Sequence, residues 1–155
     1  MRTIINILLF LAITIACPIG ANAAYQTVRG IEVEDVGNTR RAKIFTNSTL
    51  SNSYVAGGMT GTSTPPNGCL RTHDVYGKKT VGIDVQTLAG SATVTIKLVG
   101  KIADNYHEII TIEYGTTTSE LIYIVEYIEE LQVLGKVSPG GATNKVSVAF
   151  VGYKQ

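Results

Sequence analysis

Charged side chains are scarce in this sequence. They make up 16% of its 155 residues, with 13 basic residues against 12 acidic ones, whereas globular domains average about 25%. Disordered chains combine low hydrophobicity with high net charge, so a 45% hydrophobic chain with a charge of +1 does not belong to that class. A near-neutral chain also lacks the basic surface that neutralises phosphates, which argues against nucleic acid as a partner.

Cysteine is nearly absent, and the chain has only Cys17 and Cys69. Cys17 lies in a leader that we expect to be removed, which leaves Cys69 without a partner for an internal disulfide. The fold must therefore be held by a hydrophobic core. We expect Cys69 to be a small buried thiol, because free cysteine is among the most buried residue types.

Long hydrophobic runs are absent except at the N-terminus. Arg2 precedes the apolar stretch 4–17, and the small residues of 21–23 end the segment. This layout predicts a secretory signal peptide over residues 1–23, removed after Ala23. The stretch is shorter than the 18 residues that a membrane span needs. We therefore expect an extracellular or cell-surface protein without a membrane span, the periplasm being the alternative, with zero net charge after cleavage.

Catalytic and metal-binding motifs are also missing. There is no Gly-x-Ser-x-Gly motif and no phosphate-binding loop ending in Lys-Ser/Thr. Only His73-Asp74 and His107-Glu108 pair imidazole with carboxylate, which is too few ligands for zinc. We expect no enzyme activity, metal or cofactor. A small hydrolase would need two convergent carboxylates, or Cys69 beside His73.

What the sequence does contain is alternation. Apolar residues recur at every second position in four segments, and turn-forming residues separate them. A period of two places apolar side chains on one face of a sheet. We expect an all-β fold, an antiparallel β-sandwich or jelly roll, with its main part at 70–155. The alternating segments are 81–86, 94–98, 110–114 and 146–150.

The rest of the predicted domain, 24–155, has two further parts. Residues 24–45 contain an N-terminal strand region, since Val28, Ile31 and Val33 stand among charges. Residues 46–69 are dominated by Thr, Ser, Asn, Gly and Pro, and this composition predicts a long loop.

The segment 119–134 fits two structures. Residues 117–120 match a helix capping box, and five apolar residues after them share one helical face. The β-branched and aromatic run 122–125 favours a strand instead. We favour strand, loop and strand, with a single short helix near 119–134 as the alternative.

From residue 74 to the C-terminus the chain resembles small jelly-roll modules of phage tail and bacterial surface proteins. The residues that carry the likeness are 74–81, 91–96 and 145–153. Such modules often have an Asp-Gly-x-x-Trp turn, whereas this chain has Asp104-Asn105-Tyr106-His107, without the glycine and the tryptophan. The resemblance implies a non-catalytic structural or adhesive role and carries over no site residue.

Eight tyrosines make up most of the aromatic content. We place Tyr54 and Tyr106 in loops, where function concentrates. An exposed tyrosine ring offers a flat contact surface for proteins or sugars at low entropic cost. These two residues are our candidate binding residues.

The sequence thus predicts a secreted, non-catalytic structural or adhesive surface protein. Its partner would be itself or another surface protein. Little net charge favours self-assembly, and the strand at 24–36 could pair with the sheet edge of a neighbour. The alternative is a carbohydrate-binding module that binds a glycan through Tyr54 and Tyr106.

Overall fold

The computed structural model describes residues 26–28, 31–57, 69–72 and 74–154, and these residues form strands, turns and loops without a helix. The predicted signal peptide, residues 1–23, lies outside the described residues. The described ranges contain eleven strands, in the order β1 (Gln26–Val28), β2 (Ile31–Val36), β3 (Thr39–Ser48), β4 (Val55–Ala56), β5 (Cys69–Arg71), β6 (Val75–Leu88), β7 (Thr93–Ile102), β8 (Asn105–Tyr114), β9 (Thr118–Ile124), β10 (Glu130–Ser138) and β11 (Asn144–Lys154).

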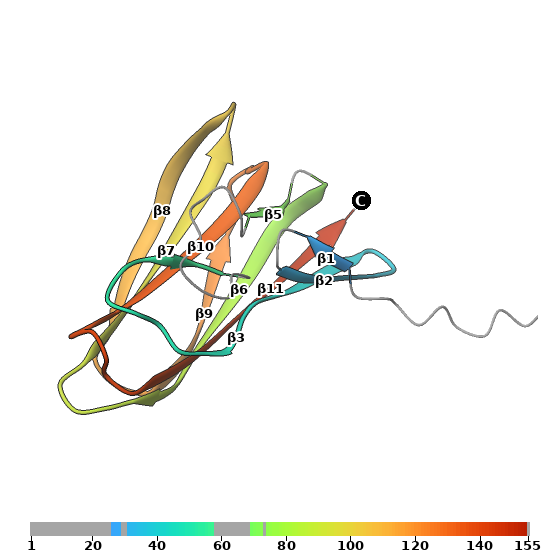
Figure 1. Cartoon of the computed structure of the whole chain (residues 1–155). Helices are drawn as coiled ribbons and strands as arrows, with labels where there is room; N and C mark the ends of the chain where they lie inside the picture. The colour runs from blue at the N-terminus through green and yellow to red at the C-terminus, as the bar shows by residue number, and fades with distance from the viewer. Residues whose placement is uncertain (1–25, 29–30, 58–68, 73, 155) are drawn as a thin grey trace, which may run out of the picture.

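The strands form two antiparallel sheets packed against each other (Figure 1). The six-stranded sheet has the order β1-β2-β3-β11-β6-β9. The five-stranded sheet has the order β4-β10-β7-β8, and β5 also pairs with β10. The predicted all-β sandwich is therefore confirmed. The described residues contain no helix that is both long and apolar enough to cross a membrane.

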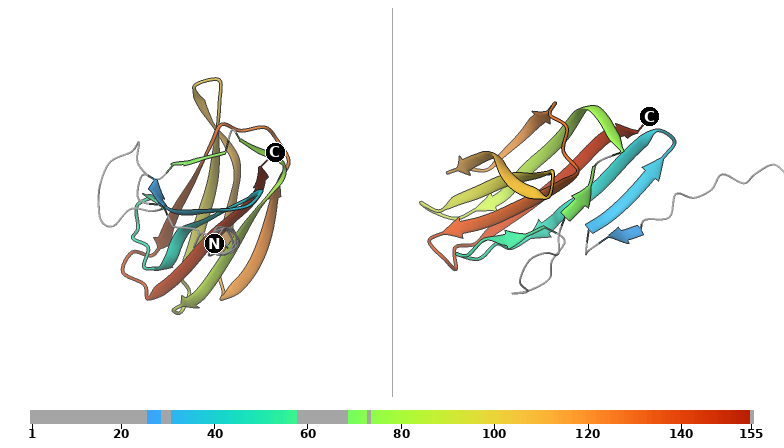
Figure 2. Two further views of the ribbon diagram at one scale, coloured as in Figure 1. Left: turned by 90° about the vertical axis from the view of Figure 1, so that its right-hand side faces the viewer. Right: turned by 90° about the horizontal axis from the view of Figure 1, so that it is seen from above.

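Figure 2 shows the two sheets from two further sides, and the apolar side chains that alternate along their strands form the core between them. The inward side chains of the central strands are at most 1% exposed, and most of them alternate with outward residues that are polar or smaller. Burial of these side chains is the main stabilising contribution to a sandwich without disulfides. The inward residues of the central strands are Val81, Ile83, Val85, Val146, Val148 and Phe150 in one sheet, and Val94, Ile96, Leu98, Leu131, Val133 and Val137 in the other.

The segment 119–134 is strand, loop and strand. β9 ends at Ile124 and β10 begins at Glu130, so the helix alternative is wrong. The inward residues Ile124, Ile128 and Leu131 are all buried between the sheets, and this packing overrides the local capping signal.

The boundaries of the predicted loop 46–69 differ from those in the structure. β3 continues to Ser48, β4 lies within the segment, and β5 begins at Cys69. Residues 58–68 lie outside the described part. The N-terminal region forms β1 and β2, and β2 pairs with β3 of its own chain.

Candidate functional site

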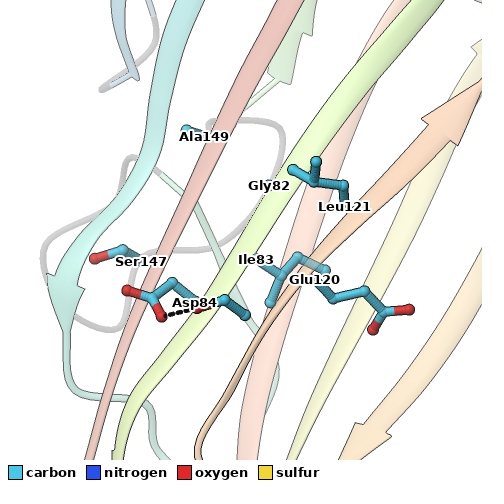
Figure 3. A pocket seen from close by; sticks show the side chains of 8 residues that line it. Gly82, Ile83, Asp84, Glu120, Leu121, Ser147 and Ala149 are labelled. Atoms are coloured by element: carbon cyan, nitrogen blue, oxygen red, sulfur yellow. Dashed lines mark hydrogen bonds between the residues drawn. The ribbon is translucent and has the colours of Figure 1, made fainter.

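The outer face of the six-stranded sheet carries a shallow groove of about 310 Å³ (Figure 3). The groove forms where the outward residues of two neighbouring strands have little or no side chain. These residues are Gly82 of β6 and Ala149 of β11, which pair with each other, and Gly82 also pairs with Leu121 of β9. A Cβ added to Gly82 would lie 3.5 Å from Leu121 Cδ2, so the leucine forms a wall of the groove. The lining residues are Gly82, Ile83, Asp84, Ser119, Glu120, Leu121, Ser147 and Ala149.

One end of the groove is polar. The Ser119 hydroxyl donates a hydrogen bond of 2.7 Å to Asp84 Oδ1, drawn as the dashed line in Figure 3. The Ser147 hydroxyl accepts from Gln86 Nε2 at 3.2 Å and from the backbone N–H of Asn47 at 2.9 Å. These groups lie on neighbouring strands, because Asp84 pairs with both Ser119 and Ser147. The polar side chains bond to one another and fix the shape of this end.

Apolar and aromatic side chains of β6, β9 and β11 also lie on this outer face, beside the polar residues Lys78 and Thr80 of β6. Leu121 is 60% exposed and Tyr123 51%, both on β9, the last strand of the sheet. Tyr153 of β11 pairs with Tyr76 of β6 on the same face, and both rings are exposed. Lys78 Nζ lies 3.5 Å from the centre of the Tyr123 ring, a cation–π contact. We call Tyr76, Gly82, Leu121, Tyr123, Ala149, Val151 and Tyr153 the sheet-face patch.

A charged border lies beside the sheet-face patch on β2 and β3. A second hollow on the far side of Ala149 is lined by Glu34, Arg41 and Lys43, among others. Lys43 Nζ lies 3.2 Å from Glu32 Oε2. An apolar centre with a polar rim is the usual anatomy of a protein–protein contact.

Tyr54 lies beside the other sheet, where Lys97 of β7 and Lys136 of β10 approach its ring. It ends the loop 49–54 before β4, as predicted, and it is 40% exposed. The side chain of Asn144 positions this loop: it accepts a hydrogen bond from Leu50 N at 2.7 Å and donates one to Leu50 O at 3.1 Å. Lys136 Nζ lies 4.7 Å from the Tyr54 ring centre, and Lys97 Nζ lies 5.5 Å from it.

Tyr106 is on strand β8, so its prediction as a loop residue is wrong. The turn between β7 and β8 is short, because Ala103 and Asp104 both adopt positive φ, and pairing resumes at Asn105. The Tyr106 hydroxyl donates to Glu130 Oε2 at 3.0 Å and lies 3.5 Å from Cys69 Sγ. Partial burial, together with these two neighbours, raises the pKa of Tyr106.

Tyr54 and Tyr106 both contact the outer face of the five-stranded sheet. Lys97 and Lys101, which approach the Tyr54 ring and pair with Tyr106, lie four residues apart along β7. At about 3.3 Å per residue, that separation is roughly 13 Å. Both tyrosines already have partners within the chain, and the structure does not bring them into one pocket.

Cys69 is buried, as predicted, at 1% exposure. His73 lies outside the described residues. No group of three His, Cys, Asp or Glu side chains within the described ranges is placed to hold a metal ion. Glu130, the hydrogen-bond partner of Tyr106, lines a polar hollow of about 380 Å³ together with Arg71, Tyr127 and Glu129.

The sheet-face patch was missed by the sequence reasoning, although a signal was present. Residues 121–125 form an uninterrupted apolar run, whereas a strand with one face in water should alternate. Both faces of β9 are therefore apolar, which points to a second covered face. No protein-family model matches this chain, and neither does any curated protein.

Proposed function

We propose that this chain is an exported, non-catalytic structural or adhesive protein of a surface, which works by contact with other protein chains, its own copies included. The observation that carries the proposal is the sheet-face patch. It joins the groove over Gly82 and Ala149 to five exposed apolar or aromatic side chains of three neighbouring strands. Contiguous exposed apolar surface of this kind marks interaction sites.

The chemistry of the patch favours a protein as the partner. Tyrosine and aliphatic side chains dominate its centre, and charged side chains lie at its border. This composition matches the core and rim of protein interfaces. A net charge of +1 adds little electrostatic opposition to assembly.

The test compares the exported protein with the variant Ala149→Arg by size-exclusion chromatography of the surface and extracellular fractions. Ala149 is exposed at the centre of the patch, so an arginine there fills the groove and places a charge in it. We expect the wild-type chain to elute above its monomer mass together with other chains, and the variant to elute as a monomer.

The matched control is Thr143→Arg, which adds the same charge at an exposed position in the turn between β10 and β11. It should elute as the wild type does. A wild-type chain that elutes as a monomer from both fractions, or an Ala149→Arg variant that keeps its partners, contradicts the proposal.

A glycan-binding module is the second candidate, and one observation favours it. Tyr106 is 46% exposed, and its partner Glu130 lines a polar hollow with Arg71 and Tyr127. Aromatic rings beside charged hydrogen-bonding groups suit a sugar ring. A glycan array on which the wild type binds and Tyr106→Ala does not would favour this function, while Tyr54→Ala reports on the distant site.

A further inference from the structure

Strand β9 is one edge of the six-stranded sheet. Among the described residues its pairing is with β6, which leaves the backbone groups of its other side facing outward. Such an edge is a template for another strand. We propose that β9 pairs antiparallel with β9 of a second copy of this chain, about a two-fold axis at Leu121. This inference rests on the proposed function and specifies the strand through which two copies contact each other.

The other edges are protected in ways that β9 is not. β1, at the opposite edge of the same sheet, has three residues. β8, at an edge of the other sheet, carries His107 and Glu108, and a bulge at Ile109 interrupts its pairing with Leu98 and Val99 of β7. Short length, charged side chains and bulges are the devices by which natural sheets block pairing at an edge.

β9 is regular, and the C-terminal half of its outer side is apolar and aromatic. Its register with β6 runs without interruption from Lys79 opposite Ile124 to Val85 opposite Thr118. Leu121 and Tyr123 are both more than half exposed on its outer side. The one charged residue of β9 is Glu120, whose carboxylate accepts a 2.8 Å hydrogen bond from the Tyr114 hydroxyl of the same chain.

The length and composition of β9 favour a second copy as the occupant. The strand has seven residues, Thr118–Ile124, and the middle one is Leu121. A two-fold axis there pairs all seven residues with their copies, in an isologous contact that closes on itself. On the outer face Leu121 then faces its own copy and Ser119 faces Tyr123, so the apolar surfaces of both chains become continuous.

A cysteine at the axis tests this register directly. Directly opposed residues in antiparallel strands have Cα atoms about 4.5–5.5 Å apart, within the range of a disulfide. The exported Leu121→Cys variant, treated with oxidised glutathione, should therefore form a covalent dimer. The wild type should not, because Cys69 is buried.

Tyr123→Cys is the matched control. In the proposed register residue 123 faces residue 119 of the other copy, so its own copy lies about 13 Å away along the strand. That distance is too long for a disulfide. A Leu121→Cys variant that stays monomeric, or a Tyr123→Cys variant that dimerises instead, overturns the proposal.

Sedimentation velocity on Leu121→Lys gives an independent measurement without a disulfide. The substitution places two like charges opposite each other at the axis, which is destabilising, and it should weaken dimerisation at least tenfold. Leu121 is 60% exposed, so the fold tolerates lysine there. If Ala149→Arg abolishes assembly and Leu121→Lys leaves it unchanged, the edge contact is wrong while the proposed function stands.

Discussion

At the scale of single residues, Ala103 is strained. Its φ of 47° lies in the left-handed region, which costs a residue with a Cβ about 1–2 kcal/mol. Ala103→Gly should therefore raise the free energy of unfolding by about 0.5–1 kcal/mol, after the entropic cost of glycine is subtracted. Thermal denaturation measures the change.

The control is the reverse substitution at another residue with positive φ, Gly90→Ala. Gly90 has a φ of 62°, and nothing within 4 Å would contact an added Cβ. The effect of this substitution is therefore conformational, and it should destabilise the protein by a similar amount. If both substitutions changed the free energy of unfolding in the same direction, backbone conformation would not decide the stability of these turns.

Asp35 makes stability depend on pH. A two-pronged contact from Arg40, with hydrogen bonds of 2.9 Å to both carboxylate oxygens, lowers the pKa of Asp35 from 3.8 to about 2. Lys154 adds a hydrogen bond of 2.9 Å. Because the pKa of Asp35 is lower in the folded state, its ionised carboxylate stabilises the fold. This stabilisation is complete above about pH 4 and is lost as the pH falls towards 2.

The variant Asp35→Asn tests this contribution. At pH 7 it should unfold more easily by about 1 kcal/mol, a value reduced for the partial exposure of the carboxylate, and near pH 2 it should match the wild type. Urea denaturation at both pH values measures the difference. Asp104→Asn, at a carboxylate that is 94% exposed, should change little, and a constant deficit of Asp35→Asn at every pH would refute the titration.

At the scale of elements, one buried side chain ties the Tyr54 loop to β11. Asn144 is 1% exposed and bonds both backbone groups of Leu50, and Ala142 O accepts a third hydrogen bond. Asn144→Ala leaves these buried groups unpaired, which costs about 1–3 kcal/mol. We expect a lower melting temperature and faster amide exchange at Leu50, while Thr143→Ala preserves both. Unchanged exchange at Leu50 would show that Asn144 does not hold the loop.

Periodicity predicted the strands that form the core, because burial on one face imposes alternation on them. The segments 81–86 and 146–150 lie in β6 and β11 as expected. Where alternation was absent, at 119–134, the pattern left two structures open: strand, loop and strand was favoured and is confirmed, but Leu121, Ile124 and Ile128 also share one helical face, and only packing between the sheets decides. β4 has two residues, which is too few for a period of two to be recognised.

The candidate site was less predictable than the fold. Tyr106 was placed in a loop because the sequence does not show that Ala103 adopts positive φ and closes the turn one residue earlier. The sheet-face patch joins residues of β6, β9 and β11 that are far apart in the sequence. Their neighbourhood depends on strand order, which no local pattern encodes.

At the scale of the whole molecule, export is the first requirement of the account. Residues 1–23 predict a cleaved leader. N-terminal sequencing of the secreted product should begin at Ala24. A product that stays inside the cell, or keeps Met1, contradicts export by this route.

We infer that the outer face of the six-stranded sheet, not that of the five-stranded sheet, contacts other proteins. Hydroxyl-radical footprinting tests it by comparing the exported protein in its assembled surface state with the dilute isolated chain. Tyr76, Tyr123 and Tyr153 should be protected in the assembled state. Tyr54 and Tyr106, at 40% and 46% exposure, should react equally in both states, and protection of these two alone would contradict the claim.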